Sequence, residues 1–179
     1  MTTQRTIAFV DLAGFTALTD VPSGDEAAAD LVDDFTKIAT IAAGVGGVEL
    51  VKTIGDAVMF AARTPEDGLE AVRRLFHATF ERDGFPEPRA GIHHGAVVER
   101  PGDYFGATVN LAARVASRAG SGQALVTATI IDAVTAADLD AVALGPHQLR
   151  NILEPVDLWA IELCATHIDI SVDPVCRMR

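Results

Sequence analysis

Two aspartates lie where their carboxylates could share metal ions. Asp11 ends an apolar, β-branched stretch (residues 6–11, TIAFVD) that predicts a strand, and Asp56 lies in a short Gly-containing turn between two further strand-like runs. In a βαββ arrangement the end of the first strand lies near such a hairpin. Two converging carboxylates can hold two divalent cations through hard oxygen ligands. From spacing alone, a turn acid at Asp56 and a cap at Asp11 are equally good interpretations.

A second group of polar residues lies later in the chain. Asn110 and Arg114 are four residues apart, so they share one face of the helix predicted over residues 108–118, and Asp103 precedes that helix. A guanidinium beside an amide suits the negative charge that develops during phosphoryl transfer. Taken alone, the pattern is more typical of a solvated helix face, with Arg118 one turn further on.

The elements that must position these residues are an alternation of strands and helices. Helix starts are indicated by the capping box Ser23-Gly24-Asp25-Glu26 and by Thr64 followed by Pro65. Apolar residues with helical spacing follow each start, and further helices are predicted over residues 108–118 and 129–135. Strands are predicted over residues 6–11, 48–53, 57–61, 89–99, 125–127, 139–144 and 156–163.

The element order predicts the fold class. Strand, helix, strand, strand, helix, strand is the βαββαβ pattern of a ferredoxin-like α+β fold, here with C-terminal additions. Residues 1–165 contain no repeat or linker and are predicted to form one domain, followed by a tail over residues 166–179. Within the tail, VDPVCRM (residues 172–178) resembles the opening DPVCGM of the small metal-associated YHS module, with Arg177 in place of Gly. The alternatives for this segment are a plain tail and the start of a truncated further module.

Composition excludes several classes of protein. The chain has 179 residues, 49% apolar and 22% charged, which is typical of a globular domain. Its formal net charge of −11 argues against a nucleic-acid partner, which needs a basic face. No apolar stretch is long enough to insert into a membrane, and no signal peptide is evident. With only Cys164 and Cys176 as cysteines, a reduced, cytoplasmic domain is expected.

Three segments, in this order, resemble the hallmark segments of class III nucleotidyl cyclases, the adenylyl and guanylyl cyclase family. They are FVDLAGFT (residues 9–16), VKTIGDAVMF (residues 51–60) and GDYFGATVNLAAR (residues 102–114). RAGIHHG (residues 89–95) resembles the family's strand between the second and third. Order and spacing agree over about residues 5–163, nearly the whole chain. The resemblance implies the family's fold and a domain that forms a cyclic nucleotide.

The resemblance also assigns roles to the residues of the first two segments. Asp11 and Asp56 match the aspartates that bind two divalent cations, Mg²⁺ or Mn²⁺. Lys52 matches the lysine that reads adenine, and Phe15 and Thr16 fall in the turn whose backbone faces the phosphates.

Further roles fall on the third segment and on the C-terminal part. Asp103 matches the acidic partner of the lysine in base selection, Asn110 the asparagine that orients the ribose, and Arg114 the arginine of the transition state. Arg150 aligns with a basic residue that grips the terminal phosphates. The family more often has Lys-Gly where this chain has Arg150-Asn151.

Lys52 and Asp103 favour ATP over GTP on chemical grounds as well. Adenine offers an exocyclic amino donor and a ring-nitrogen acceptor, which an Asp acceptor and a Lys donor complement. Guanine has a carbonyl in place of the amino group and would leave both side chains mismatched. Discrimination of this kind is large because unpaired buried polar groups are costly.

The resemblance therefore implies an adenylate cyclase. The ribose 3′-hydroxyl of ATP would attack the α-phosphate, with two-metal assistance, giving 3′,5′-cyclic AMP and pyrophosphate. Family architecture implies a head-to-tail homodimer in which one subunit supplies Asp11 and Asp56. The other supplies the remaining site residues, namely Lys52, Asp103, Asn110 and Arg114. Only seven residues separate Gly95 from Asp103, where many relatives have a longer arm, so a weak dimer is expected.

Two alternatives belong to the same family, and a third does not. A catalytically silent nucleotide-binding regulatory dimer would typically lack a metal-binding acid or the arginine, and this chain has all of them. A guanylyl cyclase would be favoured by Glu in place of Lys52 and a small residue in place of Asp103. A P-loop NTPase is disfavoured because no G-x-x-x-x-G-K-[ST] stretch is present.

Overall fold

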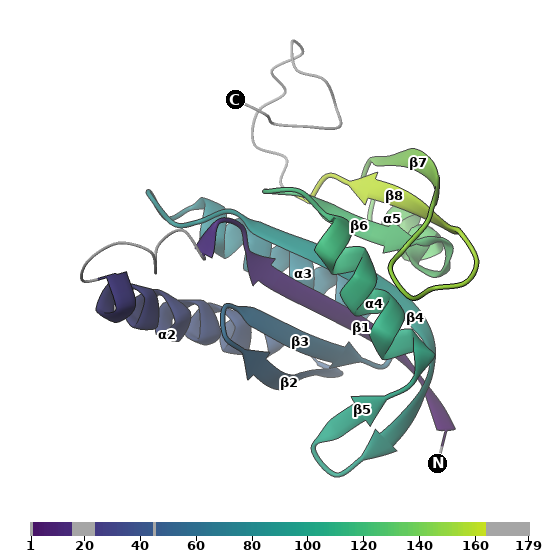
Figure 1. The fold of residues 1–179 in the computed structure, drawn as a ribbon, viewed down its shortest axis with the longest axis horizontal. Coiled ribbons are helices and arrows are strands. Elements are labelled where there is room, and N and C mark those ends of the chain that lie inside the picture. Colours follow the sequence, from purple (N-terminus) through teal and green to yellow (C-terminus); the bar gives the residue numbers. More distant parts are fainter. Residues whose placement is uncertain (1, 16–23, 45, 164–179) are drawn as a thin grey trace.

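The computed structural model describes residues 2–15, 24–44 and 46–163, in which a mixed sheet carries helices on both faces (Figure 1). The strands are β1 (Thr2–Leu12), β2 (Val48–Ile54), β3 (Ala57–Ala62), β4 (Pro88–Arg100), β5 (Asp103–Phe105), β6 (Ala124–Thr127), β7 (Ala141–His147) and β8 (Val156–Ile161). The helices are α2 (Gly24–Ala43), α3 (Pro65–Phe80), α4 (Ala107–Arg118) and α5 (Ile131–Ala136), the last preceded by a 3-10 turn over Ala128–Ile130.

The first six elements follow the predicted βαββαβ order. The sheet order is β2-β3-β1-β4-β6-β8-β7, with β5 paired to β4. β1 is antiparallel to both β3 and β4, and β6 joins β4 in parallel before β8 and β7 complete the sheet. The prediction of an α+β fold with a ferredoxin-like core and C-terminal additions is therefore confirmed.

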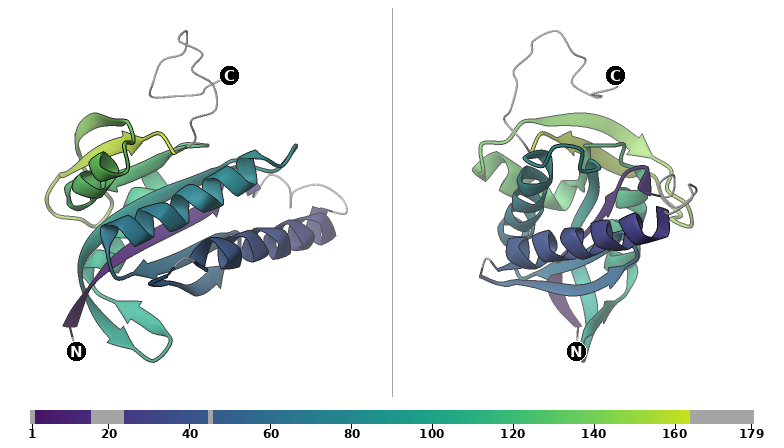
Figure 2. Two further views of the ribbon diagram at one scale, coloured as in Figure 1. Left: turned by 180° about the vertical axis from the view of Figure 1, so that it is seen from behind. Right: turned by 90° about the vertical axis from the view of Figure 1, so that its left-hand side faces the viewer.

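The central strand β1 is covered on both faces. α2 and α3 lie against one face of the sheet, and α4 lies against the other (Figures 1 and 2). Ala8 and Val10 belong to the core on the α2–α3 side, whereas Ile7 belongs to the cluster that includes Ala112 of α4. Burial on both faces explains why the sequence here reads as an almost continuous apolar run and does not alternate.

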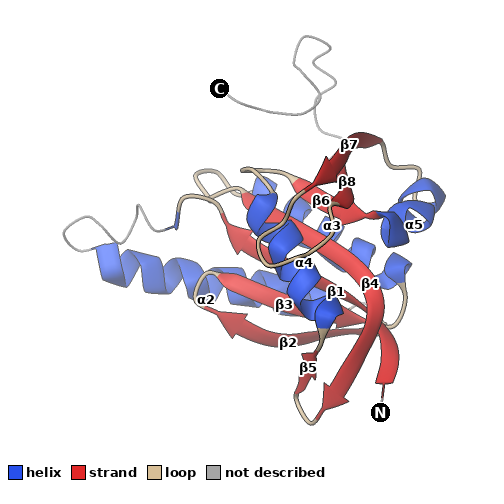
Figure 3. Ribbon diagram, turned by 45° about the vertical axis from the view of Figure 1, so that its right-hand side comes forward, coloured by secondary structure: helices blue, strands red, loops and turns tan. Residues whose placement is uncertain are grey.

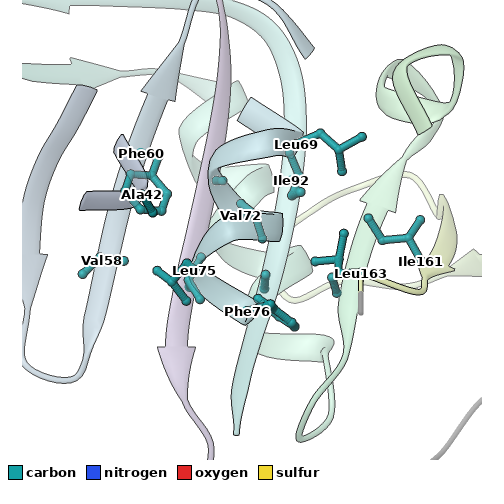
Figure 4. Close-up of a cluster of buried hydrophobic side chains, with 14 of the residues drawn as sticks. Ala42, Val58, Phe60, Leu69, Val72, Leu75, Phe76, Ile92, Ile161 and Leu163 are labelled. Carbon is teal, nitrogen blue, oxygen red and sulfur yellow. The ribbon is translucent and has the colours of Figure 1, made fainter. Parts of the chain in front are cut away.

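The larger core lies between α2, α3 and the sheet. Figure 4 shows part of it, where Leu69, Val72, Leu75 and Phe76 of α3 lie among buried side chains from the strands. Their spacing of three or four residues places them on one face of the helix. α3 begins as predicted, because Thr64 Oγ1 accepts a hydrogen bond from the Asp67 N–H at 3.2 Å. The predicted cap at Ser23 lies outside the described residues.

Some boundaries differ from the predictions. β1 begins at Thr2, four residues earlier than expected, because β4 pairs with it along its whole length from Thr2↔Val98 to Leu12↔Pro88. The short strand β5 was not predicted; it exists because the turn after Arg100 folds the chain back onto β4 (Figure 3). Both additions depend on backbone pairing with β4, and their side chains carry no alternating apolar pattern of their own.

α4 lies very close to β4 because glycines replace side chains at the contact. A Cβ atom at Gly91 would lie 2.0 Å from the backbone nitrogen of Ala116, and one at Gly95 would lie 2.7 Å from Thr108 Oγ1. The atoms that a Cβ atom at Gly91 would meet belong to the α4 backbone, so they can move only if the helix itself is displaced. The two glycines thus determine how near α4, with Asn110 and Arg114, approaches the sheet.

We expect Gly91→Ala to destabilise the protein by at least about 1–3 kcal/mol, since the added methyl group overlaps the α4 backbone. Gly46→Ala is the matched control, because nothing lies within 4 Å of a Cβ atom there. Urea denaturation followed by circular dichroism measures both variants. Equal unfolding midpoints for the two variants would contradict this account of the α4–β4 contact.

Candidate functional site

The sheet brings Asp11 and Asp56 to the same place. Asp11, at the end of β1, lies opposite Ala57, the first residue of β3, and Asp56 directly precedes Ala57 in the β2–β3 turn. Gly55 enables that tight turn with a φ of +59°, a conformation that glycine adopts without strain. The hairpin predicted from the sequence therefore brings Asp56 near Asp11, close enough for the charge of Asp11 to act on it.

The electrostatics of this pair favour a bound cation. Burial raises the pKa of Asp56 above its usual range, and the negative charge of Asp11 raises it further. The two carboxylates supply hard oxygen donors of the kind Mg²⁺ and Mn²⁺ prefer. Asp11 and Asp56 therefore fit as metal ligands. The described residues contain no cluster of three or more His, Cys, Asp or Glu side chains suited to a metal ion.

Arg89 is part of the same group, and the sequence analysis did not assign it a role. Its guanidinium makes a bidentate contact with Asp11, with Nε 2.5 Å from Oδ1 and Nη2 3.1 Å from Oδ2. The two residues lie opposite each other in the β1–β4 register. Its positive charge also counteracts part of the rise in the pKa of Asp56. The sequence showed only that Arg89 begins a predicted strand, and nothing in it paired this residue with Asp11.

Lys52 and Asp103 form a second group. The Lys52 ammonium lies 2.7 Å from both carboxylate oxygens of Asp103. The hydrogen bond from Lys52 lowers the pKa of Asp103, and the N–H of Tyr104 also donates to Oδ1 at 2.8 Å. A register shift between Leu50 and Lys52 marks a β-bulge in β2 just before the lysine. The contact joins residues that are 51 positions apart in the sequence.

Asn110 and Arg114 form a third group on α4. Asn110 is exposed and Arg114 is half-buried, whereas Ala112 and Val115 between and beyond them are buried. Within the described part of the chain, neither side chain makes a hydrogen bond or ion pair, and none links this pair to the other two groups. The helix therefore presents an amide and a guanidinium with unused donors.

Two of the three remaining predicted residues, Phe15 and Arg150, lie within the described part of the chain. Phe15 packs against the larger core after a turn at Gly14, where φ is +76°. Thr16 lies outside the described residues. Arg150 is exposed in the β7–β8 connection. Asn151 has a φ of +62°, and asparagine tolerates this left-handed conformation better than most residues, which accounts for its occurrence where the family more often has Gly.

A membrane-crossing segment was not expected from the sequence. Among the residues that the structure describes, none of the helices combines the length and the apolarity needed to cross a bilayer.

The chain belongs to the adenylate and guanylate cyclase catalytic domain family, which it matches over residues 2–83 and 85–161. It is 36% identical over 173 residues to the "pH-sensitive adenylate cyclase MT1302" of Mycobacterium tuberculosis, covering 91% of this chain and 42% of that protein. It is 40% identical over 120 residues to an "Adenylate cyclase" of Streptomyces griseus, covering 67% of this chain and 30% of that protein. The chain thus spans less than half the length of these relatives.

Solved structures of cyclases share the fold. A solved structure of an adenylate cyclase from Trypanosoma brucei, described as "in their monomeric state", superposes with a TM-score of 0.78 at 24% identity, covering 88% of this chain and 87% of that chain. The adenylyl cyclase CyaB from P. aeruginosa gives a TM-score of 0.72 at 21% identity, covering 90% and 95%. The class III cyclase fold expected from the three segments is confirmed.

The raised pKa of Asp56 predicts that its ionised form destabilises the folded protein. This penalty is absent below the pKa of the unfolded chain and appears as pH rises through the folded-state pKa. In metal-free buffer, we expect Asp56→Asn to be more stable than the wild type at pH 7 and the difference to shrink toward about pH 4. Urea midpoints across this range provide the measurement. Asp83→Asn, a change at an exposed acid, is the control. An unfolding midpoint of Asp56→Asn at or below that of the wild type at pH 7 would contradict the expectation.

Proposed function

We propose that this domain is an adenylate cyclase that converts ATP to 3′,5′-cyclic AMP and pyrophosphate. The observation that carries the proposal is the contact of Lys52 with both carboxylate oxygens of Asp103, in a chain of the cyclase family. The relatives named adenylate cyclases in M. tuberculosis and S. griseus support the same activity.

Lys52 and Asp103 would read the base. An adenine needs one acceptor for its amino group and one donor for its ring nitrogen, and these two side chains supply both at adjacent positions. The Lys52 side chain is 36% exposed and the Asp103 side chain is 26% exposed, so a ligand can reach both. Guanine would present its carbonyl to the carboxylate and leave both groups unsatisfied. The pair therefore favours ATP over GTP.

Asp11 and Asp56 would hold two divalent cations at the phosphate end of the substrate. When bound, such cations lower the pKa of the attacking hydroxyl and neutralise charge on the α-phosphoryl group. Arg89 adds a fixed positive charge beside the same carboxylates. Phe15 and Thr16 would face the phosphates through their backbone, and the exposed Arg150 would bind the terminal phosphates.

The side chains of α4 would act on the reacting atoms. Asn110 would hold the ribose so that its 3′-oxygen lies in line with the α-phosphorus. The 3′-hydroxyl would give its proton to water, the bond from its oxygen to the α-phosphorus would form, and the bond from the α-phosphorus to the leaving pyrophosphate would break. Arg114 would stabilise the negative charge on the α-phosphoryl oxygens in the transition state.

A homodimer with two shared sites accounts for the separation of the three groups. No hydrogen bond or ion pair within the described chain joins Asn110 and Arg114 to the carboxylates or to Lys52 and Asp103. If one subunit supplies Asp11 and Asp56 and its partner the other residues, two identical chains make two equivalent sites. The β4–β5 hairpin is short, so we expect a weak dimer whose specific activity rises with protein concentration.

The direct test is cyclic nucleotide formation from ATP and from GTP, each with Mg²⁺ and with Mn²⁺. We expect cyclic AMP from ATP and much less product from GTP. Lys52→Glu combined with Asp103→Gly should weaken the use of ATP and admit GTP, because the donor and acceptor pattern is inverted. A double variant that kept the wild-type preference for ATP would show that other residues read the base.

Mixing two impaired variants tests the shared site. Asp56→Ala should be nearly inactive, and Arg114→Ala should lose about 10²–10³ in rate, as when a preorganised donor is removed. A heterodimer of the two has one site with all residues intact, so mixing should restore activity to less than half of the wild type. Labelled chains establish that subunits exchange. If they exchange and no activity returns, the site is not shared in this way.

A further inference from the structure

The strands that carry Lys52 and Asp103 are joined to each other through side chains. Within the described sheet β2 pairs with β3 and β5 pairs with β4, so no backbone ladder links β2 to β5. Two side-chain contacts connect them. The first is the ion pair of Lys52 with Asp103. The second is a hydrogen bond of 3.0 Å that the Tyr104 hydroxyl donates to Glu49 Oε2.

The second contact is anchored in the core. Tyr104 is only 7% exposed and belongs to the hydrophobic cluster beneath α4 that includes Ile7 and Met59. The Arg5 guanidinium lies over its ring, 5.9 Å from the centroid, and is held by Glu99 at 3.0 Å. Tyr104 therefore links β5 to β1 and β4 through its ring and to β2 through its hydroxyl.

The two contacts are coupled by sequence. Tyr104 directly follows Asp103 and donates its backbone N–H to the Asp103 carboxylate at 2.8 Å. Glu49 precedes Lys52 by three residues, across the bulge in β2. A displacement of the Tyr104–Glu49 contact would therefore change the distance between Lys52 and Asp103.

The β4–β5 hairpin also borders a cavity. A cavity of about 710 Å³ lies beside it, lined by residues of β1, β2, β4 and β5 that include Glu49, Glu99, Asp103 and Tyr104. Side chains facing a cavity lack packing on that side. The hairpin thus depends on its specific contacts to stay close to β2.

We propose that Tyr104 and Glu49 are positioning residues for base recognition, and that their hydrogen bond holds β5 on β2 while Lys52 and Asp103 engage the base. This inference rests on the proposed function. A base read by both side chains takes up hydrogen-bonding capacity that Lys52 and Asp103 otherwise spend on each other. The contact between Lys52 and Asp103 therefore weakens when the base binds, although recognition of the base depends on the distance between them. The Tyr104–Glu49 contact has no part in reading the base and persists.

Tyr104→Phe and Glu49→Leu each remove this hydrogen bond. We expect either variant to raise the KM for ATP about 3–10-fold and to reduce the preference for ATP over GTP, while kcat stays within about 2-fold. The double variant should be no worse than the single ones, because both changes remove one contact. Glu49→Gln keeps an acceptor oxygen and should restore wild-type values. If the hydrogen bond were merely structural, its loss would reduce the amount of folded enzyme. The apparent kcat would then fall by the same factor with ATP and with GTP, and KM would not change.

Glu70→Leu is the matched control. It makes the same substitution at a carboxylate of α3, which pairs with Arg73 and Arg74 on the same helix and contacts neither Tyr104 nor Arg5. We expect its KM for ATP to stay within about 2-fold of the wild type, since the positioning bond remains.

A measurement that does not depend on activity separates the two proposals. Amide hydrogen exchange of residues 103–105 should be faster in Tyr104→Phe and Glu49→Leu than in the wild type and in Glu70→Leu. If the wild type forms no cyclic AMP, the proposed function fails and takes the role in base recognition with it. If the wild type is active but these variants keep its KM, nucleotide preference and exchange rates, the positioning role is overturned and the proposed function stands.

Discussion

The antiparallel pairing of β1 with β3 and β4 determines where Asp11, Asp56 and Arg89 lie, at one end of these central strands. This register sets Asp11 opposite Ala57 on one side and opposite Arg89 on the other. Side chains alternate between the faces of a strand, so a slip of one residue would reverse every side chain on β1. Ile7 and Val10 are fully buried on opposite faces, and their burial makes such a slip costly. Hydrophobic packing therefore holds the carboxylates and the guanidinium in place.

The charged groups at this end of the strands lower the free energy of unfolding. Burial and the neighbouring Asp11 disfavour the ionised form of Asp56, and Arg89 offsets only part of this effect. Such an arrangement is common where activity needs groups that the fold alone would not select. The hydrophobic core between α2, α3 and the sheet stabilises the fold and offsets the cost of burying Asp56.

α4 has a different relation to the sheet. Gly91 lets its backbone lie almost directly on β4 and Gly95 makes room for the Thr108 side chain, while Ala112 and Val115 are buried beneath the helix. The same close contact turns the polar face of the helix outward. Three groups of polar residues thus lie on one scaffold, and no hydrogen bond or ion pair among the described residues joins one group to another.

The sequence by itself determined the order of the elements and the placement of the local signals. Helical spacing, the cap at Thr64 and the turn at Gly55 act between near neighbours, and the structure follows them. Three motifs in order were enough to indicate the family, because each is a continuous segment.

The tertiary structure alone decided the contacts between distant residues. Arg89 meets Asp11 across 78 positions and Tyr104 meets Glu49 across 55, and neither partner marks the other in the sequence. The early start of β1 and the existence of β5 likewise depend on the length of β4, which offers backbone hydrogen bonds to whichever segment lies beside it. Backbone pairing is nearly independent of side-chain type, so composition and periodicity could not reveal it.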